Sequence, residues 1–371
     1  MAHPNAGDTH QILNVSMIVM LAKIYKEVVV YAPKDCCNDL KSQINLLDEK
    51  LADHITYITT KIVSYKQFPF WLSCGLQTLV SLMKTRKGED VFFSTLNWLC
   101  FPLFNIWCQL SKRHMYTLCH NDLEHLIDPK FGKINVRWHL INYIFKSMPL
   151  AKHNMMLVLG DSIVNNLKGV IKDSTFQHHI LSICHPYYSL APNYNKLHVH
   201  DTINIGITGA VKNKDLHNLM NMNKLLSHYP KIKLYNISIT SVDISKLENI
   251  INLNQQNKHI NRVEYDRIIE KMDILYYPYP LNSYRVSASG AVFEAIVKGK
   301  PILAMKNPYF KWLFEKFGTL GYLYDDYTEL ESCLKEIESC EQNDKIQDNL
   351  SEAKKQVNPL CMFHELKSLL H

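Results

Sequence analysis

The stretch from Asn282 to Ala304 constrains the fold of this chain more than any other part of the sequence. Small residues precede an apolar segment that predicts a helix over 291–298, and Gly299 is a typical helix end. The next residues, 301–304, predict a buried strand. The start of a helix offers free backbone N–H groups and a positive dipole end, which attract phosphate. We therefore expect a diphosphate-binding turn formed by Ser287, Ser289 and Gly290.

Glu294 lies one turn inside this predicted helix. A carboxylate in that position can accept hydrogen bonds from two adjacent hydroxyl groups, as in a ribose. A phosphate site next to a diol acceptor has the chemistry needed to hold a nucleotide diphosphate. The alternative interpretation is an ordinary helix cap, followed by a solvated glutamate that the helix dipole favours.

The length of 371 residues suits two domains better than one. Strand patterns alternate with helix patterns in both halves, which predicts parallel sheets with right-handed crossovers. A break near 185–200, rich in Pro and polar residues, predicts the hinge. We expect an α/β fold of two Rossmann-like domains facing across a cleft. The acceptor-binding domain is predicted over 1–188, and the nucleotide-sugar-binding domain with the terminal helices over 189–371.

The net charge of +6 and the charged content of 20% are moderate for a globular protein. The basic excess lies in the first half of the sequence. Such an excess fits an anionic surface or a charged acceptor better than duplex nucleic acid, so no nucleic-acid partner is expected. The ten cysteines form no C-x-x-C pair, and the first ten residues are polar, unlike a signal peptide. We therefore expect a cytoplasmic protein, with the inner face of the membrane as the alternative location.

An uncharged run from Val91 to Leu110 is long enough to be examined as a membrane span. Pro102 and several polar residues interrupt it, which instead predicts a short strand followed by an apolar helix. A buried core explains most of these residues. The alternative is peripheral membrane contact through 68–71 and 98–113, because basic residues flank these aromatic segments. The basic residues are Lys84, Arg86, Lys87, Lys112 and Arg113.

Three segments of the second half, 206–214, 271–278 and 287–301, follow one another in an order that resembles the nucleotide-sugar-binding domain of GT-B glycosyltransferases, in particular the group-1-like enzymes. The resemblance implies that the glycine-bearing turn meets the donor diphosphate and that Glu294 holds the donor ribose. In the first half, the resemblance is limited to the alternation of elements and to the His-Asn pair at 120–121.

Two positions depart from the pattern of many retaining members of this family. Val286 stands where those members have an acidic residue, and Ala210 stands where they have an arginine. The expected donor-binding residues that remain near these positions are Gly209, Lys212, Lys214 and Arg285. Arginine can bind phosphate through two parallel hydrogen bonds, so Arg285 can replace the missing cation. The alternative for the three cations is ordinary surface charge, and for the glycine a plain tight turn.

The sequence contains no D-x-D motif, so we expect transfer without a bound metal and without a cofactor. Transfer with inversion of the sugar requires a general base in the first domain. The candidates are His120 and Asp122, which follow a predicted strand, and Asp8 and His10, which precede the first helix. For each histidine the alternative is a structural imidazole. If transfer retains the configuration, these residues only orient the acceptor.

The resemblance implies a hexosyltransferase-type enzyme that uses a UDP-sugar, a GDP-sugar or a similar donor. The expected acceptor is a surface polysaccharide, such as capsule or lipopolysaccharide, or a lipid-linked oligosaccharide. One alternative is a catalytically inactive GT-B-fold partner that regulates another transferase. A second alternative is an NAD-dependent oxidoreductase, which the missing dinucleotide fingerprint disfavours.

Overall fold

The computed structural model describes residues 10–60, 67–128, 135–189, 202–258, 260–339 and 344–370. These residues form two compact units. Unit 1 contains the chain up to Pro186, together with Arg285–Ala288 and Val357–His371, and unit 2 contains Tyr187–Tyr284 and Ser289–Gln356. Each unit is built on parallel strands connected by helices. The predicted α/β class with two Rossmann-like units is therefore confirmed.

The described strands of unit 1 form a two-stranded and a four-stranded sheet, both parallel. In the larger sheet each strand pairs with the next one along the chain. Each connection between these strands therefore moves the chain in the same direction along the sheet. The smaller sheet contains β1 (Val28–Pro33) and β2 (Ile55–Thr60), and the larger contains β3 (Val91–Phe93), β4 (Met115–Leu118), β5 (Asn154–Val158) and β6 (Ile180–Ser182).

The helix α1 (Gln11–Ile24) is buried along nearly its whole length. It is apolar on all sides, which is typical of a helix in a core. It packs against the last helix, α15 (Pro359–Leu370), and the Tyr116 hydroxyl donates to the Leu370 carbonyl at 2.9 Å. We expected the terminal helices in the second domain. α15 instead belongs to unit 1, because its apolar face is buried there.

The remaining helices of unit 1 connect its strands. They are α2 (Lys34–Leu47), α3 (Glu49–Ala52), α4 (Gln67–Lys84), α5 (Phe101–Ser111), the 3-10 helix η1 (Asn121–Leu126), α6 (Asn135–Lys146), α7 (Asp161–Leu167) and α8 (Asp173–His179). The uncharged run at 91–110 divides into β3 and α5, as its sequence predicts. Among the described residues, no helix combines the length and the hydropathy that crossing a membrane requires.

Unit 2 contains a six-stranded parallel sheet in the order β11-β9-β7-β12-β13-β14. From β7 the chain builds first toward β11 and then, after β11, toward β14, so the direction reverses between β7 and β12. The bounds are β7 (Ile203–Ile207), β9 (Ile232–Asn236), β11 (Ile250–Asn252), β12 (Ile274–Tyr277), β13 (Ile302–Met305) and β14 (Gly321–Tyr324). A second, smaller pair consists of β8 (Ala210–Val211) and β10 (Ile239–Thr240).

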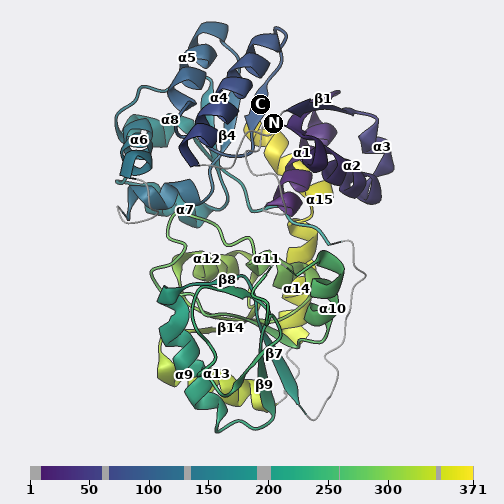
Figure 1. Ribbon diagram of the computed structural model, residues 1–371, viewed down its shortest axis with the longest axis vertical. Coiled ribbons are helices and arrows are strands. Elements are labelled where there is room, and N and C mark those ends of the chain that lie inside the picture. The colour runs from purple at the N-terminus through teal and green to yellow at the C-terminus, as the bar shows by residue number, and fades with distance from the viewer. Residues whose placement is uncertain are drawn as a thin grey trace. The chain divides into compact units, whose positions relative to one another are not determined.

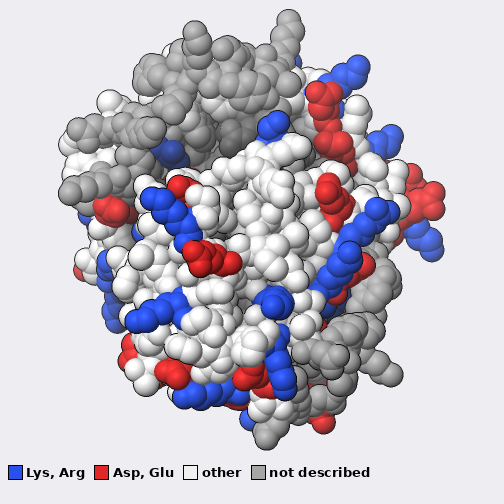
Figure 2. Space-filling model, turned by 60° about the horizontal axis from the view of Figure 1, so that its bottom comes forward, with Lys and Arg blue, Asp and Glu red and all other residues white. Residues whose placement is uncertain are grey.

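Helices cover both faces of the larger sheet of unit 2 (Figure 1). α9 (Leu216–Leu226) and α13 (Tyr327–Glu338) contact one another and share one core with the strands. The other helices are α10 (Arg262–Glu270), α11 (Val292–Lys298), α12 (Pro308–Phe317) and α14 (Asp344–Gln356), and the 3-10 helix η2 (Asn213–Asp215) precedes α9. The face drawn in Figure 2 carries Lys and Arg side chains interspersed with Asp, Glu and uncharged residues, rather than a single basic stripe.

Gly321 opens β14 with φ at 147°, and a Cβ atom there would lie against the backbone of Ile302 on the neighbouring strand. We expect Gly321→Ala to lower the free energy of unfolding of unit 2 by about 2–4 kcal/mol, because steric overlap adds to backbone strain. Gly88→Ala is the control, since Gly88 has φ at 90° but no atom near the added Cβ. It should cost about 1 kcal/mol. Urea denaturation measures both, and equal losses would contradict this account.

Candidate functional site

Two segments that the sequence analysis singled out are in contact within unit 2. Gly209 lies in the turn after β7, and Ala291 caps α11 after β12. Gly209 has φ at 82°, and a Cβ atom there would lie 3.3 Å from the Ala291 Cβ and would overlap the Tyr279 hydroxyl. Only glycine therefore permits this approach. β7 and β12 are adjacent, and ligands of open α/β sheets bind at the carboxyl ends of strands where the strand order reverses.

The predicted helix at 291–298 is confirmed as α11, Val292–Lys298, with Gly299 ending it at φ 64°. The Tyr277 hydroxyl donates to the Ala291 carbonyl at 3.0 Å, which fixes the start of α11 against β12. Ser289 is buried, and its Oγ has no hydrogen-bond partner among the described residues. Buried hydroxyl groups normally have a partner, so this atom suits a polar ligand.

The predicted cations Lys212 and Lys214 are both exposed in the turn that follows Gly209 and β8. The Lys212 backbone N–H donates to buried Asp215 at 2.7 Å, and Lys214 Nζ donates to the buried Ser283 hydroxyl at 2.8 Å. Burial raises the pKa of Asp215, and the hydrogen bond from Lys212 opposes this shift. Lys214 is thereby held against the loop that leads from β12 to α11.

Glu294 is buried, and its carboxylate accepts hydrogen bonds from side chains of the protein. Arg262 on α10 donates from Nη2 to Oε1 at 2.9 Å and from Nη1 to Oε2 at 3.1 Å. The Tyr187 hydroxyl also donates to Oε2, at 2.7 Å. Burial, followed by the nearby Glu294 carboxylate, raises the pKa of Tyr187 well above its usual value, so this tyrosine remains a neutral donor. The two parallel bonds from Arg262 are the strong geometry for such a pair.

Further ion pairs connect α10 and α11 beside Glu294. Arg262 also pairs with Asp266 at 2.9 Å, and buried Lys298 pairs with Asp266 at 2.8 Å. Positive and negative groups alternate along this network, which compensates the burial of Glu294 and Lys298. The sequence analysis found Glu294 but missed Arg262 and Tyr187. No local motif marks either residue, because both reach Glu294 from distant parts of the sequence.

Two of the predicted donor-binding residues, Arg285 and Ser287, belong to unit 1. The Ser287 hydroxyl donates to the buried carboxylate of Glu124 at 2.6 Å, and the Val286 backbone N–H donates to the same oxygen at 3.3 Å. Arg285 is exposed, and its carbonyl accepts from Asn166 at 2.7 Å. The role of Ser287 at a phosphate stays a prediction, since its partner in the structure is a carboxylate that the sequence analysis did not identify.

Three of the four candidate bases come together in unit 1. The ring of His10 stacks on that of His120, with centroids 4.7 Å apart. His120 follows β4 and donates from Nε2 to the Ser94 carbonyl at 3.1 Å. Buried Asp122 lies beside them in η1 and pairs with Arg137. The fourth candidate, Asp8, lies outside the described residues.

Burial favours a neutral imidazole at His10 of this cluster and at His185. Loss of water around the ring lowers the pKa of His10, and the charge of Asp122 opposes this shift. Burial raises the pKa of Asp122, opposed by Arg137. Burial also lowers the pKa of His185 to about 4, while its ring donates to the Pro186 carbonyl at 3.0 Å. A neutral imidazole near neutral pH can accept a proton, as a general base must.

No protein-family model and no curated protein matches the sequence. Solved structures do match. WaaG, a glycosyltransferase involved in lipopolysaccharide biosynthesis, has 12% identity and a TM-score of 0.54 over 100% of this chain and 97% of its own. TarM has 15% identity and a TM-score of 0.53 over 81% of this chain and 58% of its own. The chain has a GT-B glycosyltransferase fold.

A further match to this GT-B fold is UGT89C1 of Arabidopsis thaliana, whose structure is complexed with UDP. It has 11% identity and a TM-score of 0.50 over 97% of this chain and 96% of its own. At these identities the likeness shows the fold, which agrees with the resemblance carried by 206–214 and 287–301. Among the described residues, no group of three or more His, Cys, Asp or Glu side chains is placed to hold a metal ion.

The buried, neutral His185 makes the stability of unit 1 depend on pH. Its pKa is about 4 in the folded protein and near the usual 6.5 after unfolding. Below pH 6.5 the unfolded state therefore binds the proton first, and stability falls as the pH decreases toward 4. We expect a loss of about 3 kcal/mol at pH 4 from this residue. Urea denaturation at pH 7 and pH 4.5 should show a smaller loss for His185→Asn than for the wild type.

The control for this experiment is His178→Asn, because His178 is exposed on α8. This variant should lose as much stability between pH 7 and pH 4.5 as the wild type does. A His185→Asn protein with the full wild-type dependence would show that another group causes it.

Proposed function

We propose that this chain is a glycosyltransferase that transfers a sugar, without a metal, from a nucleotide-diphosphate donor to a glycan or lipid-linked acceptor. The observation that carries the proposal is the contact between the Gly209 turn and the start of α11, at the point where the strand order of unit 2 reverses. The GT-B fold supports the same conclusion. UDP and GDP are the donor nucleotides we favour.

In this proposal the donor diphosphate lies at the Gly209 turn. The Ser289 hydroxyl, which has no partner among the described residues, serves as a donor there. We expect backbone N–H groups of the turn and of Gly290 to donate as well. Lys212 and Lys214 supply positive charge from the same turn. Negative charge develops on the diphosphate as it leaves the sugar, so cations and N–H groups in these positions lower the barrier. Arg285 stays a further candidate cation.

Glu294 accepts the hydroxyl groups of the donor ribose in this proposal. Its carboxylate is now shared by Arg262 and Tyr187, so a diol has to replace at least one of their hydrogen bonds. Arg262 is the group that moves, because 44% of its side chain is exposed, and Asp266 remains available to pair with it. The exchange conserves hydrogen bonds to the carboxylate, which limits its cost.

The acceptor is proposed to bind at the histidine cluster of unit 1. If transfer inverts the sugar, His120, Asp122 or His10 takes the acceptor proton, and the neutral form of His10 favours it for that role. If transfer retains the configuration, these residues orient the acceptor. A surface polysaccharide or a lipid-linked oligosaccharide fits an enzyme at the cytoplasmic face of a membrane, where we place this chain.

A melting screen tests this proposal. UDP, GDP, CMP and NAD are added to the full chain in excess EDTA, and a ligand that binds the folded state raises the melting temperature by mass action. We expect a nucleoside diphosphate to raise it, equally with and without EDTA. A shift with NAD alone would favour an oxidoreductase. The absence of any shift would favour the alternative of an inactive GT-B-fold partner of another transferase.

Glu294→Ala tests the ribose contact. We expect it to weaken binding of the nucleotide that the screen identifies by about 1–3 kcal/mol, because the diol loses its acceptor. Isothermal titration calorimetry measures the affinity, and circular dichroism checks the fold. Glu331→Ala, which removes a carboxylate from the surface of α13, is the matched control and should bind like the wild type. A folded Glu294→Ala protein with wild-type affinity would remove Glu294 from the donor site.

A further inference from the structure

Two helices of unit 1 expose aliphatic side chains along one side. On α4 they are Leu72, Leu76, Val80 and Met83, and on α5 they are Leu103, Ile106 and Leu110. The spacing of three and four residues places each set on one face of its helix. The exposed fraction reaches 79% at Met83 and Leu110. We call these seven residues the α4–α5 face. Single exposed aliphatic residues are ordinary, but a row on each of two neighbouring helices is not.

The two helices run side by side in the same direction (Figure 1). Near their first turns, Asn97 Nδ2 donates to the Trp71 carbonyl at 3.0 Å, and Gly75 leaves no room for a Cβ atom beside Cys100. Just beyond their last turns, the Arg113 guanidinium donates to the Thr85 hydroxyl. The aliphatic rows therefore lie next to one another, and both helices end at the same edge.

Four of the aromatic residues in the segments predicted to contact a membrane, 68–71 and 98–113, lie in the core of unit 1. Phe70, Trp98, Phe101 and Phe104 are buried, and their rings pack inside unit 1. These side chains hold α4 and α5 in place. The exposed apolar surface consists of the aliphatic residues on the opposite sides of the same helices.

Charge is distributed unevenly around this face. Neither α4 nor α5 contains an Asp or Glu residue. The shared edge where both helices end carries cations, namely Lys84, Arg86, Lys87, Lys112 and Arg113. Two acids lie nearby: Glu89 accepts from the Arg86 backbone at 2.7 Å, and Asp90 accepts from the Tyr25 hydroxyl at 2.7 Å. These neutral donors leave both carboxylates charged, but the five cations outnumber the two acids, so the edge is positive.

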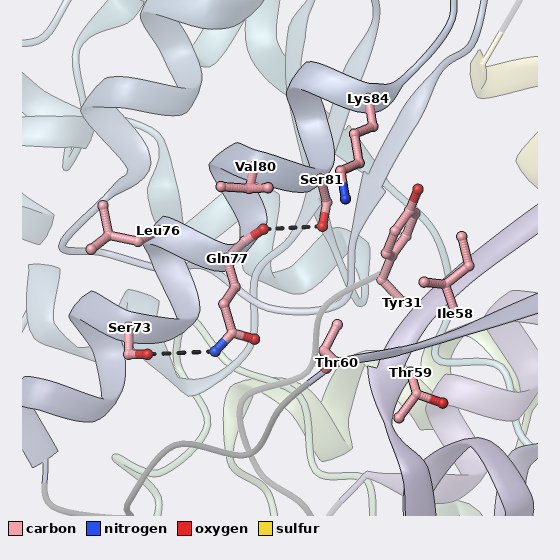
Figure 3. Close-up of a pocket in the computed structure, with 10 residues that line it drawn as sticks. All are labelled: Tyr31, Ile58, Thr59, Thr60, Ser73, Leu76, Gln77, Val80, Ser81 and Lys84. Carbon is pink, nitrogen blue, oxygen red and sulfur yellow. Dashed lines mark hydrogen bonds between the residues drawn. The ribbon is translucent and has the colours of Figure 1, made fainter.

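A pocket of about 360 Å³ adjoins the face (Figure 3). Side chains of α4 line one side, including Leu76, Val80 and Lys84, and residues of β1 and β2 line the other, including Tyr31 and Ile58. Ile58 is itself exposed, so the apolar surface extends from α4 across to β2. Hydroxyl groups and the Lys84 ammonium lie among these apolar side chains, which gives the pocket both apolar and polar walls.

We propose that the α4–α5 face docks on an anionic lipid surface. Aliphatic side chains enter the boundary between headgroups and acyl chains, and the basic edge meets the headgroup phosphates, as in interfacial amphipathic helices. The complementary charge selects a lipid surface over a second copy of this chain, which would bring two positive edges together at an interface related by symmetry. The proposal does not depend on catalysis, and it would hold a transferase near a lipid-linked acceptor.

Vesicle flotation tests the proposal with the full chain and without nucleotide. The wild type should bind vesicles that contain phosphatidylglycerol and not vesicles of phosphatidylcholine alone, and added salt should weaken binding. Leu76→Gln, Val80→Gln and Leu110→Gln combined should reduce the binding constant at least tenfold. Lys84→Gln combined with Lys112→Gln should also reduce it about tenfold and should weaken its dependence on salt.

The matched control replaces three exposed aliphatic side chains on other helices: Leu46→Gln, Val136→Gln and Met220→Gln. It should bind vesicles like the wild type, and all variants should keep the wild-type circular dichroism spectrum. Equal binding to both vesicle types, or wild-type binding by the Leu76, Val80 and Leu110 variant, would overturn the proposal. A different result would assign the face to a second copy of this chain: sedimentation shows a dimer for the wild type and the control but a monomer for the Leu76, Val80 and Leu110 variant, and the wild type does not bind vesicles.

Discussion

The pairing of Glu294 with Arg262 and Tyr187 is the interaction on which the proposed donor site depends. It joins α11, α10 and the first residue of unit 2 through one buried carboxylate. A buried carboxylate without such partners would be costly, so the three groups are fixed together. The network beyond it, through Asp266 to Lys298, ties the far end of α11 to α10 as well. These ion pairs therefore hold α11, whose cap contacts the Gly209 turn, from the side.

Much of the fold follows from local sequence patterns. The alternation of apolar strands with longer helical segments predicts the parallel sheets, and Gly299 marks the end of α11 correctly. The membership of α15 in unit 1 could not be predicted in the same way. It results from packing against α1, which lies more than three hundred residues earlier in the sequence. An apolar helix face indicates that a partner exists but does not identify that partner.

In the candidate site, too, the sequence predicts residues that belong to a local motif but not their partners from distant parts of the chain. Ser289 and Glu294 are predicted from a local motif, in which small residues precede a helix start, and Gly209 from the resemblance of segment 206–214 to GT-B enzymes. The structure brings these two segments into contact through Gly209 and Ala291. The partners Arg262, Tyr187 and Glu124 were missed, since hydrogen bonds across space leave no spacing to read. The sequence predicts His10 and His120 as independent candidates, and only the fold shows that their rings stack.

The lack of room at position 209 also limits what this turn can recognise. No side chain fits between position 209 and the cap of α11. In the proposed donor site the diphosphate therefore meets a main-chain amide at this position, which is the same for every residue type. Main-chain amides recognise a phosphate group but do not distinguish one base or one sugar from another. Selectivity among donors must therefore come from other surfaces, and those surfaces can change in evolution while this turn stays the same.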